Sequence, residues 1–181
     1  ESYHPGTFEK LKNDNFCEIG RTFVMPDFQN KKILKELIRG FVRIPESKEM
    51  TVGIGLISFN HRSLNKDCIN AFLKILKLSN KRPLDLPNGK YIYEHQMDYE
   101  IDSEKFMLKS ENIKYIEKEL KKLDVNFQMP QVLKPYLRYC EVSYENYSIA
   151  KDYNGIIQLL FSGRSENISD KQRKYLEKYS F

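Results

Sequence analysis

Two opposite charges lie inside an apolar strand pattern. Residues 16–25 alternate as a β-strand does, and Glu18 and Arg21 stand in that run. Neither face of the pattern is purely polar, so we expect a central strand that is buried on both sides. A buried carboxylate can accept a proton from an amine, and a guanidinium can hold a carboxylate or phosphate. The alternative is a structural ion pair that bridges the strand to its neighbours.

A basic loop follows this strand and opens a helix. Residues 30–43 have helical apolar spacing, and Gln29, Asn30, Lys31 and Lys32 stand at its start. Free backbone N–H groups and the positive end of a helix favour an anion at such a place. The alternative is an ordinary solvated first turn.

A second candidate segment comes at the end of the apolar run 51–58. Ser58 ends this run and Asn60 follows it directly. The Asn60 amide could fix a substrate carbonyl or a pantetheine amide. The alternative is an Asx turn, in which the same side chain bonds its own backbone.

Composition excludes several classes of protein. The chain has 181 residues, 40% hydrophobic and 30% charged, with a net charge of +5, which fits one soluble domain over residues 1–181. That charge permits an acidic partner or an anionic lipid surface. Three widely spaced cysteines give no disulfide framework and indicate a reducing compartment, and the three histidines lack metal-ligand spacing, so we expect no metal.

The sequence also lacks the motifs of several functional classes. There is no Gly-x-Ser-x-Gly elbow, phosphate-binding P-loop or dinucleotide-binding glycine pattern. Basic residues are not interleaved with aromatic ones along a strand or helix, so we expect no nucleic-acid partner.

Hydrophobic periodicity predicts alternating strands and helices, and therefore an α/β fold. Strands are expected at 16–25, 51–58, 90–99, 141–144 and 155–161. Helices are expected at 30–43, 64–78 with Ser63 as its cap, 111–123, 131–139 and 170–179. Residues 1–15 are expected to form a lead-in loop, 79–90 a surface loop and 165–181 a charged terminal segment with the last helix.

The segment 18–29 reads EIGRTFVMPDFQ, which resembles the E-[LI]-G-R-S-x-V-x-P-x-[YF]-[RQ] signature of the hemolysin-like, ornithine-lipid-synthase-type N-acyltransferases. That family belongs to the wider GNAT fold, and acyl-homoserine lactone synthases carry a similar Glu-x-x-Arg strand. Looser matches follow at 56–63, 71–73, 130–137 and 150–157.

The resemblance implies a GNAT-like mixed β-sheet flanked by helices. It also implies transfer of a fatty acyl chain from acyl carrier protein to the amine of an amino acid or related head group, giving an N-acyl amino-acid lipid. Glu18 would help to deprotonate the amine, and Arg21 would hold the polar network or an anionic group. Residues 29–32 would face the phosphopantetheine of the donor, with Ser58 and Asn60 as further contacts.

Departures from the family refine these expectations. Asn30, Lys32 and Leu34 stand where acetyl-CoA-dependent members have glycines, which favours acyl-phosphopantetheine on carrier protein as the co-substrate over acyl-CoA. No permanently bound cofactor or metal is implied. Because the product would be a lipid, we expect a cytoplasmic protein that can touch the inner face of the membrane.

The resemblance also implies that the fold is incomplete at its amino end. The family has a helix-rich half before the Glu-x-x-Arg strand, whereas about 17 residues precede it here. A longer chain or a partner chain would supply that half. Two alternatives stay open: a non-catalytic binding or assembly module that keeps the fold, and an acetyl-CoA-dependent enzyme acting on a small amine.

Overall fold

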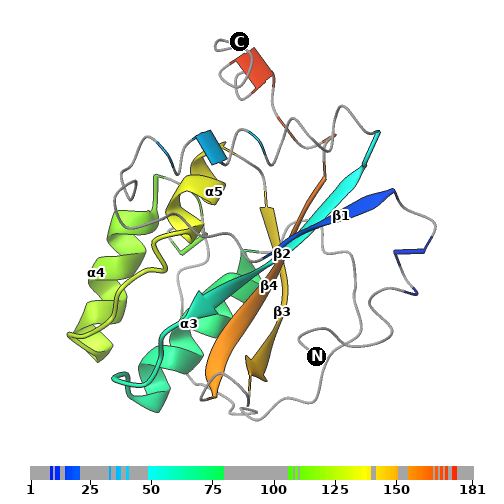
Figure 1. The fold of residues 1–181 in the computed structure, drawn as a ribbon. Coiled ribbons are helices and arrows are strands. Elements are labelled where there is room, and N and C mark those ends of the chain that lie inside the picture. The colour runs from blue at the N-terminus through cyan, green and yellow to red at the C-terminus, as the bar shows by residue number, and fades with distance from the viewer. Residues whose placement is uncertain are drawn as a thin grey trace.

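The computed structural model describes residues 9, 11–12, 15–20, 33, 36–37, 40, 49–79, 106–107, 109, 111–139, 142–150, 155–164, 166, 168, 170 and 173–174. Figure 1 shows the elements that these residues form, and they confirm a mixed α/β architecture. In chain order the elements are β1 (Phe16–Ile19), β2 (Val52–Phe59), α3 (Lys66–Leu78), α4 (Ile113–Leu123), α5 (Leu133–Tyr139), β3 (Val142–Ala150) and β4 (Ile156–Arg164).

The strands form one mixed sheet in the order β1-β2-β4-β3. β1 runs parallel to β2, with Glu18 opposite Ile54, whereas β4 is antiparallel to both of its neighbours. The parallel pair needs a crossover connection, and residues 33, 36, 37 and 40 within that connection are helical. The last strand therefore inserts between β2 and β3, which no local pattern in the sequence indicates.

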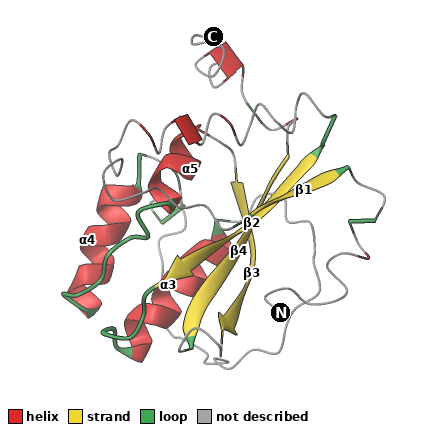
Figure 2. Ribbon diagram, viewed as in Figure 1, coloured by secondary structure: helices red, strands yellow, loops and turns green. Residues whose placement is uncertain are grey.

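Alternate side chains of the sheet pack against the helices. Ile57 and Phe59 of β2 and Leu159 of β4 are buried in one core with residues of α3, α4 and α5. Figure 2 shows the three helices gathered on one side of the sheet. The centre of this core is aromatic, because the ring of Phe72 lies 4.8 Å from that of Phe59 and 5.3 Å from that of Phe127. This side of the sheet is the face that we call the helix face.

The opposite side of the sheet has a smaller core, and we call it the second face. Val52 and Ile54 of β2 and Leu160 of β4 are buried there together with Leu11. Leu11 is 1% exposed, although the sequence predicted only a polar lead-in loop for residues 1–15. The few apolar residues of this segment, such as Phe8 and Leu11, form no periodic pattern in the sequence, so the burial of Leu11 depends on tertiary contacts.

The amino end of α3 is fixed by Asn65, not by Ser63 as the sequence predicted. The Asn65 side chain accepts a hydrogen bond from the Cys68 N–H at 2.8 Å, as an N-cap does. Its own amide donates to the Leu123 carbonyl at 2.7 Å, and its backbone N–H donates to Asp124 Oδ2 at 2.8 Å. The backbone N–H groups of Asn65 and Asn126 bond the Asp124 carboxylate and lower its pKa. The bonds of Asn65 to Leu123 and Asp124 join the start of α3 to the end of α4.

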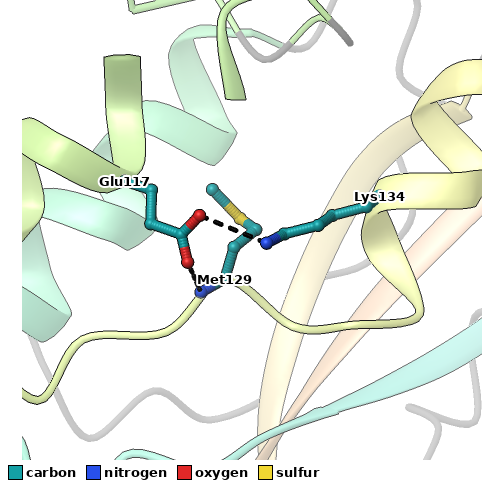
Figure 3. A network of polar contacts seen from close by, with 3 residues as sticks. All are labelled: Glu117, Met129 and Lys134. Carbon is teal, nitrogen blue, oxygen red and sulfur yellow. Dashed lines mark hydrogen bonds and ion pairs between the residues drawn. The ribbon is translucent and has the colours of Figure 1, made fainter. Parts of the chain in front are cut away.

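The link between α4 and α5 is held by one carboxylate. Figure 3 shows Glu117 accepting a hydrogen bond from the Met129 N–H at 3.2 Å and pairing with Lys134 at 3.2 Å. Glu117 and Lys134 are both partly buried, so the pair is better shielded from solvent than a surface ion pair. The bonds set the path of the segment that returns from α4 to the sheet.

Most predicted elements are confirmed with shifted ends. The strands at 51–58 and 155–161 become β2 and β4, and the helices at 64–78, 111–123 and 131–139 become α3, α4 and α5. The strand predicted at 141–144 is much longer, because β3 continues to Ala150 through a bulge between Tyr144 and Asn146. The bulge breaks the two-residue alternation on which the prediction depended.

The remaining predicted elements lie wholly or largely outside the described residues. Of the helix at 170–179, residues 170, 173 and 174 are described and helical. The strand at 90–99 and the loop at 80–90 fall outside the described residues, and so does the second half of the strand at 16–25.

Candidate functional site

Glu18 lies on β1, at one edge of the described sheet. Its side chain is exposed, so the expected burial on both sides is wrong for this residue. The physical reason is the strand order, because β1 has only β2 as a neighbour among the described strands. Opposed residues of paired strands point to the same face, so Glu18 lies on the second face beside Ile54.

A second carboxylate lies across the same row of the sheet. Ile54 is opposite Ser162 of β4, and Ser162 is 3% exposed. The Ser162 hydroxyl donates a hydrogen bond to the Glu145 carboxylate. Two strand spacings of about 4.8 Å separate the Cα atoms of Glu18 and Ser162, about 10 Å in all, and Glu145 reaches Ser162 from β3, one strand further across.

Glu145 lies at the β3 bulge. The register passes from Tyr144 to Asn146, and Glu145 is the extra residue between them. Tyr144 is buried on the helix face and Asn146 is opposite Leu160 on the second face, so the bulge places two consecutive residues, Glu145 and Asn146, on the second face, and bulges are common beside active sites. Sequence reasoning missed Glu145, although a charge inside the run VSYENYSIA was a signal that could have drawn attention to it.

The other predicted site residues are not all brought together. Arg21, Gln29, Asn30, Lys31 and Lys32 lie outside the described residues. Ser58 is exposed on the second face, four residues beyond Ile54, which is about 13 Å along the strand from the level of Glu18. A group that contacts both Glu18 and Ser58 must therefore be elongated.

Asn60 makes a local turn. Its side-chain oxygen accepts a hydrogen bond from the Arg62 N–H at 3.5 Å, which is the Asx-turn alternative. Asn60 is exposed, at the carboxyl end of β2.

Ser58 belongs to a polar row that crosses three strands. Gln158 of β4 is opposite Ser58 on one side and opposite Ser148 of β3 on the other. Ser148 Oγ and Gln158 Oε1 are buried and form no hydrogen bond with any group in the described part of the chain. A buried polar atom without a partner costs about 1–3 kcal/mol, so native proteins keep few of them.

Neither described cysteine has the environment of a nucleophile. Burial raises the pKa of the Cys17 thiol. Burial and the nearby Asp124 carboxylate raise the pKa of Cys68 to about 11. Both thiols are therefore protonated at neutral pH, whereas thiol nucleophiles react as thiolates. The environment of these two thiols therefore gives no support to covalent catalysis by either of them.

Among the described residues, no three His, Cys, Asp or Glu side chains are grouped so that they could ligate a metal ion. No helix in the same part of the chain combines the length and apolarity needed to cross a membrane.

Comparison with protein-family models, with curated proteins and with solved structures finds no match to this chain. The resemblance to N-acyltransferases therefore depends on the sequence motif, and what it implies about activity stays a prediction.

Proposed function

We propose that this chain is a GNAT-like fatty N-acyltransferase domain. It moves an acyl chain from acyl carrier protein to the amine of an amino acid or related head group. The observation that carries the proposal is the Glu18-x-x-Arg21 motif, because the carboxylate of this motif is exposed on a strand of a mixed sheet. The sheet order β1-β2-β4-β3, with β1 and β2 parallel, is compatible with such a fold.

The chemistry needs a base near an amine and a thioester. In the proposed reaction Glu18 accepts a proton from the acceptor ammonium, directly or through a water, which frees the nitrogen lone pair. The amine nitrogen then attacks the thioester carbonyl carbon, a C–N bond forms and the C–S bond breaks. The leaving phosphopantetheine sulfur takes up a proton, and the product is an amide. The exposure of Glu18 supports this role, since a substrate can reach the carboxylate.

The donor is proposed to be carrier protein because of charge. Lys31, Lys35 and Arg39 recur at a four-residue spacing in the connection between β1 and β2. A cationic stripe of this kind suits an acidic partner. No permanently bound cofactor is proposed, and peripheral contact with the membrane is a corollary of a lipid product.

The test measures the transfer of palmitate from palmitoyl carrier protein to free amino acids, and mass spectrometry detects the products. Any longer native form of the protein is assayed in parallel. Glu18→Gln should reduce turnover by about 10²–10⁴-fold, the usual contribution of a general base. Glu166→Gln removes an exposed carboxylate elsewhere and should leave turnover unchanged.

Two outcomes would contradict the proposal. Unchanged turnover in Glu18→Gln would remove this residue from the chemistry. Carrier-protein binding without any product, in the chain and in any longer native form, would favour the non-catalytic module instead.

A further inference from the structure

The outer side of α4 carries a cluster of exposed lysines. Its members, which we call the lysine face, are Lys114, Lys118, Lys121 and Lys122. Their spacing of i, i+4, i+7 and i+8 places them on one side of the helix, opposite the buried Ile113, Ile116 and Leu120. About four to eight basic residues on such a helix are typical of a surface that binds anionic phospholipid.

The two glutamates of α4 are turned away from solvent, which leaves the lysine face cationic. The side chains of Glu117 and Glu119 are 20% and 18% exposed, whereas that of Lys122 is 62% exposed. Glu117 pairs with Lys134 and bonds the link between α4 and α5 (Figure 3), and Glu119 pairs with Lys122 at 2.7 Å. The Asp124 carboxylate after the helix is already bonded by two backbone N–H groups. The other three lysines form no ion pair within the described part of the chain.

Exposed apolar side chains border the lysine face. Val125, just after α4, is 79% exposed, and Val132, just before α5, is 42% exposed. Val132 lies two residues before Lys134, which its pair with Glu117 holds to α4. Tyr115, on the helix itself, is 39% exposed. Lysines beside apolar side chains match the boundary of a bilayer, where charged headgroups and acyl chains meet.

The lysine face lies on the opposite side of the sheet from Glu18. The buried residues of α4 belong to the core of the helix face, whereas Glu18 is exposed on the second face. In Figure 1, α4 lies farther from the strands than α3 or α5 does. A helix is about 10 Å across, so the helix layer and the sheet together separate the lysine face from the proposed base. A carrier protein docked on α4 would have no direct path to Glu18, and the lysine face therefore suits a partner that does not take part in the reaction.

We infer that the lysine face is the surface by which this protein lies on a membrane of anionic phospholipid, with Val125 in the headgroup layer. Because the apolar side of α4 is in the core, the helix rests on the headgroups and does not insert. This orientation turns Glu18 towards the water, from which carrier protein and amino acid arrive. The inference assigns a surface to the membrane contact of the proposed function, and it holds with or without acyl transfer because the Glu18-x-x-Arg21 motif takes no part in it.

The experiment measures sedimentation of the chain with vesicles in the absence of any substrate. Vesicles of phosphatidylcholine alone are compared with vesicles that contain about one third phosphatidylglycerol. We expect at least about tenfold tighter binding to the anionic vesicles at about 0.1 M salt, and loss of this preference at about 0.5 M salt, where the screening length is shorter. Lys118→Gln and Lys121→Gln should each weaken binding about fivefold, the usual contribution of one lysine near an anionic surface.

Two further variants separate this surface from the net charge of the protein. Lys12→Gln removes the same charge from an exposed lysine next to Leu11 of the second face, and should change binding by less than about twofold. Val125→Asn should weaken vesicle binding about threefold, because part of an apolar side chain no longer leaves water. The melting temperature of Val125→Asn without vesicles should be unchanged, since the side chain is 79% exposed in the free protein.

The outcomes distinguish this inference from the proposed function. Equal binding to both kinds of vesicle, or anionic binding that Lys118→Gln and Lys121→Gln leave unchanged, would overturn the inference. Carrier-protein binding that the same two variants weaken, without any vesicle binding, would also overturn it and would assign the lysine face to the donor. Anionic vesicle binding by a protein that transfers no acyl group would support the inference and contradict the proposed activity, whereas acyl transfer without such binding would do the reverse.

Discussion

Two glycines of β2 give a sharp test of how β1 is positioned. Gly53 and Gly55 both lie in the part of β2 that pairs with β1, and Gly55 is opposite Ile19 in the parallel register. A Cβ atom added at Gly55 would lie 3.0 Å from the Ile19 carbonyl oxygen, a backbone atom that can move only if β1 moves. A Cβ atom added at Gly53 would first meet Ile19 Cδ1 at 3.6 Å, which is ordinary van der Waals contact.

The two substitutions are expected to change the free energy of unfolding in opposite directions. Gly55→Ala should lose about 1–3 kcal/mol, the usual cost of forcing one extra carbon into a packed site. Gly53→Ala should be neutral or gain up to about 1 kcal/mol, since glycine weakens a strand interior by that amount. Because β1 carries Glu18, Gly55→Ala should also reduce acyl transfer more than its loss of stability explains.

Urea unfolding followed by far-ultraviolet circular dichroism measures both variants against the wild type. The chain has no tryptophan and 12 tyrosines, so tyrosine fluorescence provides the second optical signal. Equal stability of Gly53→Ala and Gly55→Ala would refute the close approach of β1 to β2 at Ile19.

Asn65→Ala should lower the free energy of unfolding by about 1 kcal/mol or somewhat more, because the α3 cap and the bond to Leu123 are both lost. The same urea titration measures this change, and an unaltered midpoint would contradict the cap. Cys68 should react with iodoacetamide at pH 8 about 100-fold more slowly in the native chain than in 8 M urea, because burial and a pKa near 11 remove the thiolate. Since folding raises this pKa from 9.0, the neutral thiol is favoured in the native state, and stability should fall as pH rises from about 9 towards 11. Equal alkylation rates in both states would show that Cys68 is accessible.

Local patterns predicted the elements that have one clear apolar face. α3 buries Cys68, Ile69, Phe72 and others at helical spacing, and α4 buries Ile113, Ile116 and Leu120, so both helices could be predicted from periodicity. The apolar runs of β2 and β4 likewise identified two strands. These elements follow from residues that are near one another in the chain.

Features that depend on distant residues could not be predicted. The insertion of β4 between β2 and β3 is a pairing over about 100 residues of chain, and alternation in one strand says nothing about its partner. Ser63 and Asn65 are both acceptable caps by residue type, and only the contacts of Asn65 with Leu123 and Asp124 decide between them.

The candidate site also combines features that the local sequence predicts with features that depend on distant residues. Glu18 was identified from an unusual charge in a strand, but its exposure and its neighbours Ile54 and Ser162 follow from the sheet register. Glu145 was missed because its contact with Ser162 depends on the pairing of β3 with β4. Gln158 and Ser148 were missed because each is an ordinary polar residue until the register places them together.

The most direct test of the central claim is a single competition assay. Palmitoyl carrier protein and acetyl-CoA are supplied together with a mixture of amino acids, and the amide products are identified by mass spectrometry for wild type and Glu18→Gln. We predict N-palmitoyl amino acids from the wild type, with little acetyl product and a loss of about 10²–10⁴-fold in Glu18→Gln. Acetylated amines as the main product, or palmitoyl transfer that is equal in both proteins, would contradict the proposed donor or the proposed base.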